Sequence, residues 1–232
     1  MEGNLSNSDM NCINQKLIKD YQIYVVDMDG TLYYKYPMRL SVLFQMVGYY
    51  LFHITNWKEI LFLKDYRHLR ESEELLQKAD CERRIRFLLS QKYHFAPEKA
   101  NDIIEEWMYK RPLSAVFKSR DKKLLAFLKA QQQNGHQLYL YSDYPLEDKS
   151  RIMGLDADGL YYPDNVRFSF LKPNPEGLSL ILRENNLSPA DVLMIGDRQD
   201  KDGQCAINAG TDYLILKSTF FARCRQYKKW SI

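Results

Sequence analysis

The sequence predicts an α/β fold, a doubly wound parallel sheet whose first strand is separated from the others by inserted helices. Beyond residue 112, apolar runs typical of buried strands alternate with amphipathic helical segments, which is the order of a parallel sheet. Residues 36–111 show helical periodicity alone. We therefore expect a sheet domain formed by residues 1–35 and 112–232, and a helical cap domain, a four-helix bundle, formed by residues 36–111.

Five segments are expected to contribute to the sheet. The first, residues 21–27 (YQIYVVD), is continuous, aromatic and β-branched, as expected of a strand buried on both faces. Three later strands are predicted at residues 136–143, 191–197 and 212–216. Residues 157–170 indicate a short strand or a hairpin.

Helices are expected on both sides of the domain boundary. In the inserted block we predict four helices, at residues 40–54, 57–70, 72–91 and 97–109. In the sheet domain we predict three, at residues 121–135, 174–186 and 204–210. The basic segment 223–230 is expected to be a solvated terminal helix.

The composition is that of an ordinary globular protein, with 45% hydrophobic and 27% charged residues. The formal charge of +3 is too small to argue for a nucleic-acid partner. The polar N-terminus does not resemble a signal peptide. Residues 40–54, the most apolar segment, fall short of the ~18 residues of a membrane span, so we interpret them as a buried or cap helix and expect no membrane partner.

The cysteines are widely scattered and show no zinc-binding spacing. This pattern fits a reducing cytoplasm better than a disulfide framework, so a cytoplasmic location is expected. The four residues are Cys12, Cys81, Cys205 and Cys224.

Polar residues follow three of the predicted strands at the point where each strand ends. They are Asp27 and Asp29, then Ser142 and Asp143, then Asp197, Asp200 and Asp202. Ligands of open parallel sheets bind outside the carboxyl ends of the strands, so these side chains should converge there. Lys172, which comes just before a predicted helix, can join them.

The convergence explains why two carboxylates stand one residue apart in VVDMDGT. Carboxylates that close repel one another unless a cation or a proton lies between them. Mg²⁺ is usually held by one or two carboxylates together with waters and substrate phosphate. Gly30 permits close backbone approach, and Ser142 and Lys172 supply a hydroxyl and a compact positive charge. These groups suit phosphoryl transfer to a carboxylate.

The chain resembles the haloacid dehalogenase (HAD) superfamily of phosphohydrolases at four motifs in order. These are DMDGT at 27–31, YLYSD ending at 143, LKPNPEG containing Lys172, and GDRQDKD at 196–202. The resemblance implies a Rossmann-like catalytic core, with the helical block at the position of the family's cap. It also implies a Mg²⁺-dependent phosphatase acting on small-metabolite phosphomonoesters through an aspartyl-phosphate.

The resemblance assigns a role to each matching position. Asp27 is the nucleophile, and Asp29 is the general acid and base. Thr31, Ser142 and Lys172 bind the phosphate. Mg²⁺ is held by Asp27, the backbone carbonyl of Asp29 and Asp197. Asp202 orients the metal shell, with Asp200 as a competitor for that role.

Some positions remain open at this stage. Relatives often carry Asn where this chain has Asp143, whose role is therefore undecided. Arg198 could pair with an acid on its own loop. Of the cap aromatics, most are expected in the core, whereas Tyr33 and Tyr34 could face the substrate. Four cationic residues could hold a second anion, although a solvated face is the simpler interpretation: Arg67, His68, Arg70 and Arg111.

Two alternatives to the phosphatase also stay open. A sugar phosphomutase shares the aspartyl-phosphate, and no motif separates it from a phosphatase. A non-catalytic phosphate-binding or signalling protein is the alternative from a different class. Dehalogenation is not expected, because those relatives dispense with the second aspartate that Asp29 supplies. The particular phosphomonoester and the oligomeric state are left undetermined.

Overall fold

The computed structural model describes residues 18–72, 80–163, 167–230 and 232. Several predictions concern residues outside these ranges and are not addressed by it. They are the interpretation of the N-terminus, the state of Cys12, the part of the expected helix 72–91 that spans 73–79, and the part of the segment 157–170 that spans 164–166.

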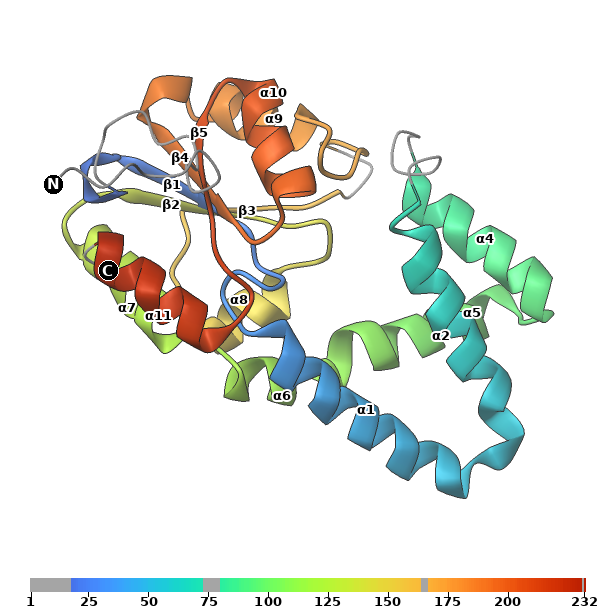
Figure 1. Ribbon diagram of the computed structural model, residues 1–232. Coiled ribbons are helices and arrows are strands. Elements are labelled where there is room, and N and C mark those ends of the chain that lie inside the picture. The colour runs from blue at the N-terminus through green and yellow to red at the C-terminus, as the bar shows by residue number, and fades with distance from the viewer. Residues whose placement is uncertain (1–17, 73–79, 164–166, 231) are drawn as a thin grey trace, which may run out of the picture.

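The core of the molecule is a five-stranded parallel sheet in the order β3-β2-β1-β4-β5 (Figure 1). The strands are β1 Ile23–Val26, β2 Gln137–Tyr141, β3 Gly159–Tyr161, β4 Val192–Gly196 and β5 Asp212–Ile215. Val26 lies opposite both Leu140 and Ile195, so β1, β2 and β4 end side by side. This confirms the predicted α/β fold with a doubly wound parallel sheet.

Helices cover both faces of the sheet. They are α7 Lys122–Gln133, α8 Glu147–Met153, α9 Glu176–Glu184, α10 Gln204–Ala209 and α11 Phe220–Trp230. Tyr24 and Val26 pack in the cluster formed with α7, α8 and α11, whereas Ile23 and Val25 pack in the cluster formed with α9 and α10. Successive side chains of a strand point to opposite faces, and β1 is buried on both.

A second group of helices follows β1 and extends to one side of the sheet (Figure 1). Its members are α1 Lys35–Phe52, α2 Trp57–Leu69, α4 Cys81–Tyr93, α5 Pro97–Ile104 and α6 Pro112–Lys118, with a π-helical turn at Glu105–Lys110. Helices α1, α2, α4 and α5 of this insertion share a hydrophobic cluster of their own, which includes Phe62, Ile85 and Trp107. Helix α6 differs, because its Val116 packs in the cluster that flanks the sheet with α7, α8 and α11.

Most of residues 40–54, which we interpreted as a buried or cap helix, lie in α1, which belongs to the inserted helices and is mostly not buried. Only Val42 and Tyr50 are buried along its length, and Phe44 and Leu51 are 68% and 67% exposed. The helix also begins five residues earlier than predicted. Among the described residues, no helix is long and apolar enough to cross a membrane.

Helix α11 is the predicted terminal helix, and its basic residues Arg225, Lys228 and Lys229 are exposed, but Arg223 is an exception to the expected solvation. Arg223 is fully buried, and its guanidinium donates to the Asp121 carboxylate at 3.0 Å and to the backbone carbonyls of Gly30 and Thr31. Tyr227 donates its hydroxyl to the same carboxylate at 2.5 Å. A sequence pattern of basic residues cannot reveal that one of them has a buried carboxylate partner about 100 positions away. This contact ties α11 to the loop that carries the DMDGT motif.

We expect Asp121→Asn to lower the free energy of unfolding by about 3–5 kcal/mol, because it leaves the Arg223 charge buried without a counter-ion. Asn caps a helix N-terminus as well as Asp does, so the lost stability measures the ion pair and not the capping of α7. Urea denaturation measures the difference. Tyr227→Phe is the control and should cost less, about 1.5–3 kcal/mol, the usual contribution of a hydrogen bond to a charged group. Equal losses in the two variants would contradict a dominant role for the ion pair.

Candidate active site

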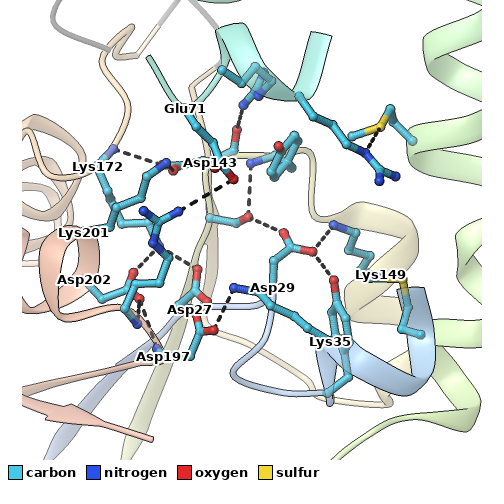
Figure 2. Close-up of a pocket in the computed structure, with 18 of the residues that line it drawn as sticks. Asp27, Asp29, Lys35, Glu71, Asp143, Lys149, Lys172, Asp197, Lys201 and Asp202 are labelled. Atoms are coloured by element: carbon cyan, nitrogen blue, oxygen red, sulfur yellow. Dashed lines mark hydrogen bonds and ion pairs between the residues drawn. The ribbon is translucent and has the colours of Figure 1, made fainter. Parts of the chain in front are cut away.

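A pocket of about 170 Å³ lies at the carboxyl ends of β1, β2 and β4, beside α1 and α2 (Figure 2). The structure brings most of the predicted site residues to its wall. They are Asp27, Asp29, Ser142, Lys172, Asp197 and Asp202. Thr31 lies directly behind this wall, and Asp200 points into solvent. Three strand ends and the Lys172 loop therefore meet at one place.

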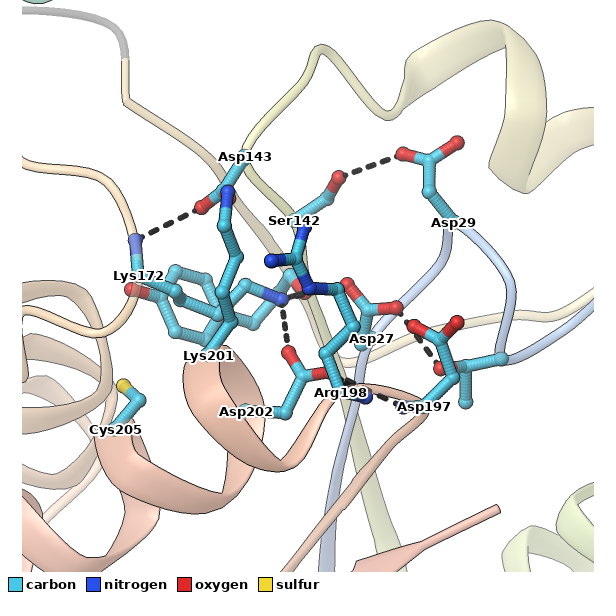
Figure 3. Close-up of polar contacts among 12 residues, drawn as sticks. Asp27, Asp29, Ser142, Asp143, Lys172, Asp197, Arg198, Lys201, Asp202 and Cys205 are labelled. Carbon is cyan, nitrogen blue, oxygen red and sulfur yellow. Dashed lines mark hydrogen bonds and ion pairs between the residues drawn. The ribbon is translucent and has the colours of Figure 1, made fainter. Parts of the chain in front are cut away.

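Lys172 lies between two carboxylates at the centre of the site (Figure 3). Its ammonium is 2.6 Å from Asp27 and 2.6 Å from Asp202, and its side chain is 2% exposed. Burial alone would lower the pKa of Lys172, but Asp202 and Asp27 outweigh burial and raise it well above its usual value. The lysine is therefore a permanent positive charge beside Asp27.

The loop around Asp27 holds the carboxylate in a fixed orientation. The hydroxyl of Thr31, which is fully buried, donates to Asp27 Oδ2 at 2.9 Å, and its backbone N–H bonds to the Met28 carbonyl. In this structure Thr31 therefore orients the carboxylate, and its binding of phosphate stays a prediction. Gly30 has φ +93°, and a Cβ there would collide with Lys35 and Asp197. The positive φ favours glycine at this position, whereas the side-chain ends that a Cβ would meet could shift.

Asp29 lies across the pocket from Lys172 and has three polar partners. Its carboxylate accepts from Lys149 Nζ and Tyr33 Oη at 2.5 Å each and from Ser142 Oγ at 3.1 Å. Burial would raise the pKa of Asp29, but the Lys149 charge and hydrogen bonds from Lys149 and Tyr33 outweigh it, so the pKa is lowered. Asp29 is thus an ionised carboxylate in the free protein.

Three carboxylates form a cluster that fits a divalent cation. One oxygen from each of Asp27, Asp197 and Asp202 can be chosen so that all lie within 4.8 Å of one another. Burial raises the pKa of Asp27 and of Asp197, in each case against the opposing effect of a neighbouring lysine. A hard cation coordinated by these oxygens would relieve that cost, which is the donor chemistry Mg²⁺ prefers.

The loop after β4 separates the roles of its two later aspartates. It forms a π-helical turn at Gln199–Gly203, which turns Asp202 inward, where its Oδ2 accepts from the backbone N–H groups of Asp197 and Arg198. Asp200 is 66% exposed and pairs with Arg198. This is the pairing with an acid of its own loop that the sequence suggested for Arg198. Of the two candidates for supporting the metal, only Asp202 lies at the cluster.

Asp143, whose role the sequence left open, is part of the local framework. Its carboxylate accepts from the backbone N–H of Lys172 at 3.0 Å and lies 3.3 Å from the Lys201 ammonium. Burial would raise the pKa of Asp143, but Lys172 and Lys201 outweigh it and lower the pKa. The carboxylate therefore fixes the Lys172 loop, and its charge is matched by two lysines.

Sequence reasoning missed several residues of the pocket. Lys35 pairs with Asp197 at 2.7 Å, Lys149 with Asp29 and Lys201 with Asp143. The available signals were weak: Lys35 stands four residues after the DMDGT motif, and Lys201 stands beside Asp202. Surface lysines are common, so neither position alone indicates an ion pair.

The structure divides the aromatic and arginine candidates of the cap. Tyr33 lines the pocket, whereas Tyr34 packs against Phe220 and the Arg223 guanidinium and does not. Arg70 is buried and pairs with Glu82, contrary to the expectation of a solvated face. Arg111 pairs with Glu106 at 2.7 Å.

Comparison with known proteins connects this geometry to one family. A family model described as haloacid dehalogenase-like hydrolase matches residues 21–210. No curated protein matches the chain significantly.

Solved structures with similar folds include three from this family, all below 20% identity. The HAD-hydrolase YfnB from Bacillus subtilis, bound to magnesium, has a TM-score of 0.63 at 17% identity and covers 91% of this chain and 99% of its own. A HAD phosphatase from Thermococcus onnurineus has a TM-score of 0.58 at 17% identity, covering 84% and 86%. A 2-haloacid dehalogenase from Pseudomonas syringae has a TM-score of 0.55 at 14% identity, covering 84% and 86%. At these identities the likeness is one of fold.

We expect Asp197→Asn to weaken Mg²⁺ binding at least ~10-fold, because it removes a charged oxygen from the carboxylate cluster. Asp200→Asn is the matched control on the same loop and should bind Mg²⁺ like the wild type. Isothermal titration with MgCl₂ measures both. Weakening by the Asp200 substitution that equals the Asp197 effect would place the cation on the exposed loop instead.

Proposed function

The chain belongs to the haloacid dehalogenase-like hydrolase family, and from this premise we propose that it is a Mg²⁺-dependent phosphatase. It would hydrolyse phosphomonoesters of small metabolites through a phosphoaspartate formed on Asp27. The observation that carries the proposal is the setting of Asp27, a buried carboxylate with Lys172 at 2.6 Å, Thr31 at 2.9 Å and a second aspartate two residues on. We further propose that residues 36–111 form the cap over this site.

In the first half of the reaction, an oxygen of Asp27 attacks the phosphorus atom and the ester oxygen leaves. Lys172 offsets the charge that gathers on the phosphoryl oxygens, and the Ser142 hydroxyl can turn from Asp29 to one of them. Asp29 delivers a proton to the departing oxygen, which requires that the carboxyl be protonated when the substrate is bound. The products of this half are an alcohol and a phosphoaspartate.

In the second half, water attacks the phosphoaspartate and releases inorganic phosphate. Asp29, now ionised, accepts the proton of that water, and Asp27 is regenerated as a carboxylate. Asp27, Asp197 and the backbone carbonyl of Asp29 would hold Mg²⁺, with Asp202 fixing the backbone beneath them. When bound, the ion supplies positive charge to the phosphoryl oxygens.

We expect Mg²⁺-dependent release of phosphate from a panel of phosphomonoesters, abolished by EDTA. Asp27→Asn should remove turnover, since no nucleophile remains. Asp29→Asn should lower kcat by ~10²- to 10⁴-fold, the usual contribution of a general acid and base. Phosphate release by malachite green assay measures both, with Asp200→Asn as the matched control.

Two outcomes would contradict the phosphatase. Isomerisation of a sugar phosphate without phosphate release, dependent on a bisphosphate activator, would identify a mutase. Absence of turnover in a folded protein that binds Mg²⁺ would favour a binding or signalling role.

Lys149→Met should move the alkaline limb of the kcat/KM profile to higher pH. Without the ammonium, burial dominates, the pKa of Asp29 rises, and the carboxyl retains the proton needed for the first half-reaction up to a higher pH. A pH series of kcat/KM measures this. Lys201→Met, whose charge faces Asp143, should leave the limb in place. A shift to lower pH in the Lys149 variant would contradict Asp29 as the acid.

A further inference from the structure

The cationic residues that line the pocket are not all matched by carboxylates. Eight lysines and arginines lie on its wall: Lys35, Arg39, Arg67, Arg70, Lys149, Lys172, Arg198 and Lys201. Six of them form ion pairs with acidic residues. Within the described part of the chain, no carboxylate lies at ion-pair distance from the other two, Arg39 and Arg67.

These two arginines come from different helices of the insertion and face the same pocket as Asp27. Arg39 lies in the first turns of α1, and Arg67 lies in the last turn of α2. Desolvation lowers the pKa of Arg67, and the neighbouring Arg39 charge adds to the effect. Both residues are exposed, so water solvates them in the free protein, and no described carboxylate matches them. Their like charges leave this side of the pocket positive, which favours an anion that enters it.

Among the described residues, the hydrogen-bond partner of the exposed Arg67 guanidinium is a sulfur atom. Its Nε donates to the Met108 sulfur at 3.4 Å, and a thioether is a weak acceptor. The nearby acid Glu71 instead approaches Arg198, at 3.8 Å. A carboxylate or phosphate would replace the sulfur with a charge-assisted and often bidentate partner.

We propose that the substrate carries a second anionic group, a carboxylate or a phosphate, and that Arg39 and Arg67 bind it. The inference rests on the proposed phosphatase and specifies its substrate class. Asp27, Arg39 and Arg67 line one pocket, so the ester phosphate and the second anion would belong to one small molecule.

Three matched esters test this specificity. They are 3-phosphooxypropanoate, its neutral amide, and propane-1,3-diyl bisphosphate. For the wild type, kcat/KM for one or both anionic esters should exceed that for the amide by roughly 10-fold or more, the usual effect of a hydrogen bond to a charged group. Arg39→Met and Arg67→Met should each reduce this ratio toward one. The anionic ester whose kcat/KM, relative to the amide, falls more in the arginine variants identifies the second group as a carboxylate or a phosphate.

Arg83→Met is the matched control. It removes an arginine of the same helical insertion, on α4, whose side chain is 80% exposed and outside the pocket, and it should keep the wild-type ratio. Equal hydrolysis of all three esters, or an anion preference that survives in both pocket variants, would overturn the inference and leave the phosphatase intact.

Equilibrium binding separates this inference from the proposed function. If no ester is hydrolysed, the phosphatase fails, and titration calorimetry of the acid and its amide with the Mg²⁺-loaded protein decides the rest. Tighter binding of the acid that is lost in Arg67→Met would support the second anion site on its own. Equal binding of acid and amide would overturn it.

Discussion

The arrangement of charge at the carboxyl edge of the sheet is the constraint on which the site depends. The parallel topology brings Asp27, Asp197 and Asp202 within reach of one another, where burial raises the pKa of Asp27 and of Asp197. The ammonium of Lys172 is buried between two of these carboxylates and offsets the repulsion between them. The position of this lysine is in turn fixed by Asp143, which binds its backbone N–H.

The remaining cations reach this edge from separate parts of the chain. Lys35 comes from the start of α1, Lys149 from α8 and Lys201 from the π-helical turn after β4. Each opposes a different carboxylate, so the pocket is nearly balanced wherever the sheet forms its wall. Among the described residues, the pocket cations without a carboxylate at ion-pair distance, Arg39 and Arg67, lie on the side formed by α1 and α2. This arrangement is the basis for our proposal that the insertion selects for charge and the edge of the sheet carries the chemistry.

The fold and the central residues of the candidate site could be predicted from the sequence because both depend on local patterns. Apolar runs that end in Asp27, Ser142 and Asp197 predict parallel strands and a common edge. The ion pairs of Lys149 and Arg223 could not be predicted, since each partner is chosen by packing more than 100 positions away. Which of Asp200 and Asp202 lies at the carboxylate cluster could not be predicted either, because it depends on a π-helical turn that points one carboxylate inward.

The contact between Arg223 and the carbonyls of Gly30 and Thr31 also orders events in time. Arg223 lies 193 positions after Gly30 and 192 positions after Thr31 in the sequence. At ~5–20 residues per second, the ribosome therefore adds Arg223 roughly 10–40 s after these two residues. During that interval the loop bearing Asp27 exists without the guanidinium that anchors it. In a nascent chain the loop that carries Asp27 therefore lacks this contact until α11 has been synthesised and has packed.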